Sequence, residues 1–233
     1  MTTAPNTSTL AWPARPKYVV FGFIAVMMVI VLYRDRVLLD PAAPIWEHYR
    51  FFRWWLLPHG LAGALALFLG PLQFSSRLRR RVLRWHRLIG RTYVCGVAVA
   101  VPIGTLIEYV KYVHGIATLR LLVGSFGFGG LWALTTGVGF AMVKRRRIQT
   151  HQRWMTRSYA VALVFLANRC IDQIPWLAKL WEWPSTLLET HHVSDMWLVI
   201  ALSLVGAEVI IRSQDYLERG RRVAALRASP ASA

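Results

Sequence analysis

Long apolar runs divide this chain, and short polar or basic segments separate them. Apolar runs of about 20 residues are typical of helices that cross a lipid bilayer. The pattern therefore predicts an all-α fold, a polytopic bundle of six transmembrane helices. The six expected spans cover residues 18–32, 58–74, 88–109, 121–143, 154–176 and 193–211.

The segments at the two ends of the chain are not apolar. Residues 1–17 are rich in Thr, Ser, Ala and Pro, a composition that predicts a disordered N-terminal segment. Residues 18–211 are expected to form one transmembrane domain, and residues 212–233 a basic tail. The first run precedes Tyr33 and Arg34 rather than a small-residue cleavage site, so we expect an uncleaved span.

Arginine is distributed unevenly between the polar segments. The loop after the second run, the loop after the fourth run and the C-terminal tail contain most of the Arg residues. Cytoplasmic loops of membrane proteins carry an excess of Lys and Arg. We therefore predict a multi-pass protein of the bacterial inner membrane with both termini in the cytoplasm.

The composition changes how the charge is interpreted. The chain has 233 residues, 55% of them apolar, with 11 Trp, a mean hydropathy of +0.39 and a formal net charge of +17. Such a charge in a soluble protein would suggest nucleic acid, but no soluble module remains here to bind it. The expected partners are the lipid bilayer and its anionic headgroups. Cys95 and Cys170 are expected at different depths, which argues against a disulfide.

Two similar motifs stand where a basic loop meets an apolar run. His86 follows the first basic loop, Gly90 lies four residues later on the same helix face, and Tyr93 continues that face. His151 follows the second basic loop, and Tyr159 comes about two turns later. The two histidines are therefore expected at the same depth and on the same side of the membrane, with Gly90 leaving space beside the His86 ring.

Two imidazoles that face each other across a helix bundle can ligate haem iron. The first hypothesis is therefore haem b with His86 and His151 as its axial iron ligands and Gly90 beside the ring. Arginines beside the pair would hold haem propionates or lipid phosphates. These are Arg87, Arg91, Arg153 and Arg157. The alternative is that the histidines anchor their helices at the interface and bind no cofactor.

His59 begins the second run, at the opposite membrane face from His86, with Gly63 four residues later. A second, outer haem would need His59 together with His114, His191 or His192. The fourth run contains no histidine that could complete such a site. His59 is therefore a weaker cofactor-binding candidate than the pair His86 and His151.

Three acidic or basic residues inside the expected spans have no assigned role: Arg169, Asp172 and Glu208. Charged residues within a span mark functional sites or extend to the interface. The sequence contains no paired-cysteine, zinc-protease, phosphate-loop or nucleophile-elbow motif. It therefore leaves open whether the protein is an enzyme.

Three segments resemble the DUF2306 family of predicted bacterial membrane proteins. They read HGLAGALALFLGPLQF, HRLIGRTYV and HQRWMTRSYA. The resemblance covers about residues 59–172 and implies a multi-span inner-membrane protein without an assigned reaction. The matching positions are His59, Gly70, Pro71, His86, Arg87, Gly90, Arg91, His151, Arg153, Met155 and Arg157.

The histidine-bearing hairpins are also similar in outline to the cytochrome b561 fold. That resemblance implies a four-helix core, spans two to five, that carries paired histidines inside six spans. The fourth span here lacks the expected histidine, which leaves one haem or none. Two functions remain open: haem-dependent electron transfer in the membrane, and a haem-free scaffold that binds lipid or assists transport.

Overall fold

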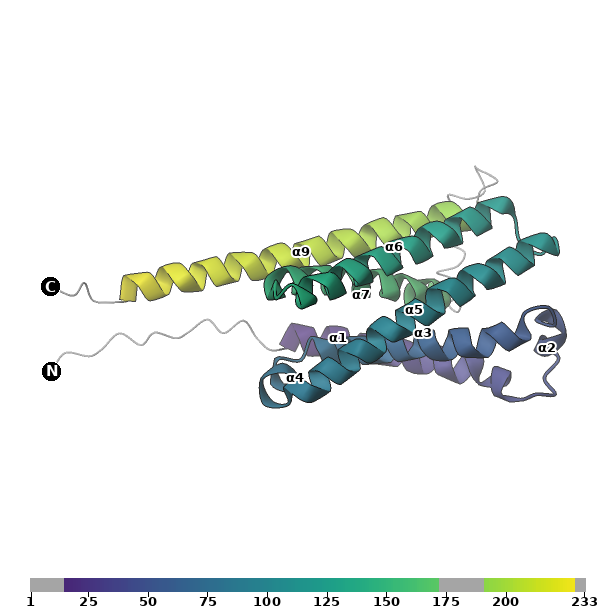
Figure 1. Cartoon of the computed structure of the whole chain (residues 1–233), viewed down its shortest axis with the longest axis horizontal. Helices are drawn as coiled ribbons and strands as arrows, with labels where there is room; N and C mark the ends of the chain where they lie inside the picture. The colour runs from purple at the N-terminus through teal and green to yellow at the C-terminus, as the bar shows by residue number, and fades with distance from the viewer. Residues whose placement is uncertain (1–14, 172–190, 229–233) are drawn as a thin grey trace.

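The computed structural model describes residues 15–171 and 191–228, and within these ranges it contains helices and no strand. The long helices run roughly parallel to one axis (Figure 1). The elements are α1 (Arg15–Asp35), the short 3-10 helix η1 (Arg36–Leu39), α2 (Ile45–His48), α3 (Arg53–Gln73), α4 (Ser76–Arg81), α5 (Leu83–Val113), α6 (Leu119–Lys144), α7 (Ile148–Ile171) and α9 (His191–Ala228).

Four of the described helical segments are long and apolar enough to cross a membrane. They are Arg53–Gln73, Leu83–Val113, Leu119–Lys144 and Trp197–Leu217. The apolar part of α1, Phe21–Tyr33, is shorter. α7 carries Arg153 and Arg157 in its first half, which lowers its hydropathy. The all-helical membrane class predicted from the sequence is confirmed; the described residues contain four candidate spans, and the count of six stays a prediction.

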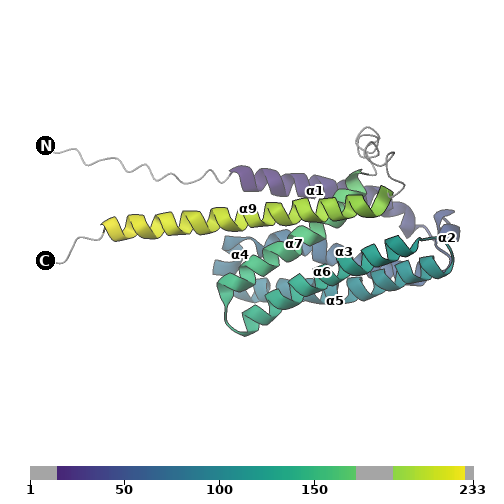
Figure 2. The ribbon, with the colours of Figure 1, turned by 90° about the horizontal axis from the view of Figure 1, so that it is seen from above.

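The helices α3, α5, α6 and α7 form a four-helix ring. Each packs against the next along the chain, and α3 also contacts α7. This order places α5 and α7 opposite each other across the ring. α1 and α9 lie outside the ring against α7, and α9 extends past the other helices (Figure 2).

Small residues let α3 and α5 approach closely. Ala62 and Ala66 of α3 are buried against Gly96 of α5, and a Cβ on Gly96 would lie 2.8 Å from the carbonyl oxygen of Ala62. Small residues at helix contacts allow close backbone packing in membranes, where a hydrophobic driving force between helices is absent. Tyr93 and Val97, both almost completely buried, continue this contact into the centre of the ring.

Both basic connections lie at one end of the bundle. α4, which joins α3 to α5, and the turn between α6 and α7 are at the same end as the start of α1 and the end of α9 (Figure 1). Ser75 caps α4 by accepting a hydrogen bond from the Leu78 N–H at 3.3 Å. At the second connection, Arg146 adopts a positive φ of 58°. The first turns of α5 and α7 therefore begin at this basic end.

Several predicted boundaries differ from the structure. α1 begins at Arg15, inside the segment predicted to be disordered. α3 begins at Arg53, so Pro58 lies within the helix instead of starting it. α9 continues through the predicted tail to Ala228. Helix propensity extends these helices beyond the apolar residues, which mark only the part that lipid can cover.

Candidate functional site

The two histidines of the sequence motifs lie at the basic end of the ring on opposite helices. His86 is in the first turn of α5, and His151 is in the first turn of α7. His86 experiences an electrostatic effect from Arg79 of α4 and a smaller one from His151. Both histidines thus begin helices at the same end of the ring, and their joining in one site stays a prediction.

The orientation of the His151 ring is fixed by the backbone of α6. Its Nδ1 lies 2.7 Å from the carbonyl oxygen of Gly139, which can only accept, so Nδ1 carries the proton. In the neutral ring this leaves the lone pair on Nε2, the arrangement found in histidines that bind metals. Gly139 also lets α7 lie close to α6, because a Cβ there would lie 2.7 Å from the Met155 sulfur.

On the α5 side, two buried polar atoms have no hydrogen-bond partner among the described residues. They are His86 Nδ1 and Gln73 Nε2. The Gln73 side chain lies beside Gly90, where its Oε1 would be 3.2 Å from an added Cβ. Leaving a buried polar group unpaired costs about 1–3 kcal/mol. The Gln73 side chain thus fills the gap that was expected beside Gly90.

Gln73 was not a candidate from the sequence. It is the single polar residue between the last apolar residues of the second run, a position typical of a helix end at the interface. Its relevance follows from the α3–α5 packing, which brings it to Gly90. A glutamine directly before a basic loop was the only available signal.

The four candidate arginines divide into two pairs. Arg153 makes two hydrogen bonds, 2.9 and 2.8 Å, to the carboxylate of Asp215, and Arg157 Nε lies 2.6 Å from Glu208 Oε1. Both contacts join α7 to α9, so these guanidinium groups are engaged with carboxylates. Arg87 and Arg91, in contrast, are exposed and form no ion pair with any described residue.

His59 belongs to a separate place in the ring. Its Nδ1 lies 2.9 Å from the Ala100 carbonyl oxygen of α5, and a Cβ on Gly104 would lie 2.7 Å from the His59 ring. Gly63, the expected companion of His59, has no atom within 4 Å of an added Cβ. His114 stacks on Phe51 near the outer end of α5. The side chains of His191, His192, Arg169 and Asp172 lie outside the described residues.

A buried polar network crosses the ring about two helical turns after the histidines. Tyr93 Oη lies 2.8 Å from Ser158 Oγ and accepts a 3.2 Å hydrogen bond from Trp132 Nε1. Ser158 Oγ also lies 2.7 Å from Thr136 Oγ1. The network joins α5, α6 and α7 and fixes the helices that carry the histidine pair. The sequence singled out Tyr93 but gave no signal for its partner 65 residues away.

Tyr159 closes the opposite corner of the ring. Its hydroxyl donates to the Leu67 carbonyl at 3.1 Å, and its ring contacts Phe74 and lies directly on Gly70. An added Cβ on Gly70 would overlap the Tyr159 ring. Gly70 therefore lets α3 and α7 meet, which closes the four-helix ring.

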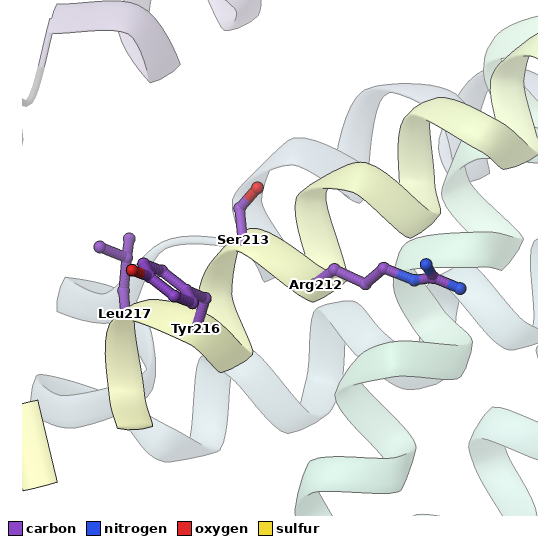
Figure 3. Close-up of a pocket in the computed structure, with 4 residues that line it drawn as sticks. All are labelled: Arg212, Ser213, Tyr216 and Leu217. Carbon is purple, nitrogen blue, oxygen red and sulfur yellow. The ribbon is translucent and has the colours of Figure 1, made fainter. Parts of the chain in front are cut away.

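Two open surface grooves occur among the described residues. One, about 420 Å³, is lined by residues of α9 alone, Arg212, Ser213, Tyr216 and Leu217 (Figure 3). The other, about 360 Å³, lies between α3, α4 and α5. Neither contains His86 or His151.

The pair supplies two imidazoles, the donor set that haem iron can take from a protein. No cluster of three or more metal-binding side chains occurs within the described ranges, but a haem iron needs only two protein ligands. His86 Nδ1 and Gln73 Nε2 are buried without a hydrogen-bond partner among the described residues. The flexible side chain of Gln73 lies against Gly90, and that of Met155 lies against Gly139.

Comparison with known proteins gives one match. A family model described as predicted membrane protein (DUF2306) matches residues 56–210, which includes α3 to α7 and the first half of α9. No curated protein and no solved structure matches the chain. The match covers more than half of the chain and includes both histidines, so this chain belongs to the DUF2306 family of predicted membrane proteins.

Proposed function

We propose that this protein binds one haem b between α5 and α7, where His86 and His151 would hold the iron, and that it carries electrons within the membrane. The observation that carries the proposal is the pair of histidines on opposite helices of a four-helix ring. Haem b bound there would supply a one-electron redox couple.

The chain's own residues would prepare this site in three ways. The Gly139 carbonyl holds His151 Nδ1 and directs the remaining lone pair to Nε2. Gln73 leaves the space beside Gly90 by rotating its side chain, which is not held by a hydrogen bond through its amide nitrogen. The Tyr93–Ser158 hydrogen bond keeps α5 and α7 at a fixed separation beneath the histidines.

Propionate binding would fall to Arg87 and Arg91. Both are exposed near the basic end and are not paired with carboxylates of the described residues. Arg153 and Arg157 instead hold α9 against α7 through Asp215 and Glu208. The competing function is a haem-free scaffold that binds lipid, in which the two histidines only anchor α5 and α7.

The proposal includes six spans, with α1 and α7 crossing the membrane beside the four apolar candidates. Its topology follows from the Arg-rich sequence of α4 and of the α6–α7 turn, which both lie at one end of the bundle (Figure 1). Reporter fusions after Arg79 and Arg147 should both indicate the cytoplasm, and a fusion after Ile116 should indicate the outside. A cytoplasmic signal at Ile116 would contradict the six-span arrangement in the bacterial inner membrane.

Haem content tests the function. The full chain, produced with a supplement of haem precursor and purified in detergent, should contain about one haem b per chain by pyridine haemochrome assay. The His86→Ala variant should insert normally and lose this haem, because one of the two axial ligands is missing. A colourless wild-type protein would refute haem binding and favour the scaffold function.

A further inference from the structure

The cavity between α3, α4 and α5 has the composition of a lipid site. Its lining residues are Leu72, Ser75, Leu78, Arg81, Val82 and Ile89. Four of them are aliphatic, and Ser75 is already used as the helix cap of α4. Arg81 is therefore the single charged side chain in the lining. The cavity is a shallow groove of about 360 Å³ that is open to the surroundings of the helices.

The position of the cavity explains why its lining combines aliphatic side chains with one arginine. It lies where α3 ends and α5 begins, so its aliphatic lining continues the apolar surface of two candidate spans. Arg81 stands at the basic connection, where a bilayer places its headgroups. An occupant thus needs an apolar chain and, directly above it, a group that complements a guanidinium.

The charge around the cavity selects an anionic group. Arg79, Arg80 and Arg84 are exposed beside Arg81, and none of these four arginines pairs with a carboxylate of the described residues. Arginine binds phosphate through several directed hydrogen bonds. The second basic connection, with exposed Arg145 and Arg147, borders neither described cavity.

We propose that this cavity binds one anionic glycerophospholipid, with an acyl chain along Leu72, Leu78 and Ile89 and the phosphate at Arg81. The site is separate from the histidine pair and does not depend on haem binding. A retained lipid there would fix α4 against α3 and α5.

The test uses the purified full chain in detergent and measures binding of phosphatidylglycerol and phosphatidylcholine by native mass spectrometry. We expect phosphatidylglycerol to bind at least fivefold more tightly. Arg81→Gln should weaken phosphatidylglycerol binding about fivefold, the contribution of one cation near an anionic lipid. Arg147→Gln is the matched control, since it removes one exposed arginine from the other basic connection, and binding should not change.

Two further measurements distinguish binding at this cavity from general attraction between anionic lipid and basic residues. Ile89→Trp should fill the cavity and reduce binding of phosphatidylglycerol, while free glycerol phosphate should not compete with the lipid. The inference would be overturned by equal losses in Arg81→Gln and Arg147→Gln, by equal binding of the two lipids, or by competition from glycerol phosphate. Haem content should remain unchanged in Arg81→Gln, so the two proposals can fail separately.

Discussion

Replacing His151 with alanine is expected to abolish the haem b absorption while the chain still inserts and remains folded. The change removes one proposed iron ligand and the hydrogen bond to Gly139, which contributes about 1 kcal/mol to folding. The polar network at Ser158 and the ion pairs of Arg153 and Arg157 remain. Reduced-minus-oxidised difference spectra of the purified variant provide the measurement.

The matched control is His114→Ala. His114 also places Nδ1 near a backbone carbonyl, that of Val110 at 2.8 Å, and its ring stacks on Phe51 at 4.0 Å between centroids. It lies at the end of α5 opposite to His86. This variant should keep the full haem content. Equal haem content in His151→Ala and His114→Ala would show that His151 does not hold the haem.

Replacing Gly70 with alanine should lower the free energy of unfolding more than any other glycine-to-alanine substitution in α3. The added methyl group would overlap the Tyr159 ring, which is held by its hydrogen bond to the Leu67 carbonyl and is 5% exposed. Moving that ring separates α3 from α7. Overpacking of this kind costs about 1–3 kcal/mol, and loss of the hydrogen bond adds about 1 kcal/mol. Thermal unfolding in detergent measures the difference.

Gly63→Ala provides the comparison in the same helix. An added Cβ at Gly63 meets no atom within 4 Å, so alanine there should be neutral or stabilise the helix by up to about 1 kcal/mol. The two variants therefore share the chemical change and differ only in what surrounds the methyl group. Similar melting temperatures for both would show that Tyr159 does not pack on Gly70.

Much of the fold could be predicted from the sequence because lipid imposes a simple requirement. Apolar length identifies helices that can span a bilayer, and grouped arginines identify the connections at one end. These two patterns placed His86 and His151 at the same end before any contact was known. The number of spans is harder to predict. Two arginines of α7 lower its hydropathy, although both pair with carboxylates of α9.

The contacts of the site were beyond the sequence because they join residues far apart in the chain. Arg157 and Glu208 are 51 positions apart, and neither motif indicates the other. A gap beside the His86 ring was predicted at Gly90, but the Gln73 side chain lies there because α5 packs against α3. Helix periodicity predicts which residues share one face of a helix. It does not predict which face of a neighbouring helix they contact.

The most direct test of the account is the electron paramagnetic resonance spectrum of the oxidised wild-type protein. Two imidazole ligands should give a low-spin ferric haem signal, which His86→Ala and His151→Ala each convert to high spin or remove. The same spectrum should be retained in His114→Ala. A wild-type protein that has no haem signal after expression with haem precursor, or a signal that neither His86→Ala nor His151→Ala alters, would contradict ligation by this histidine pair.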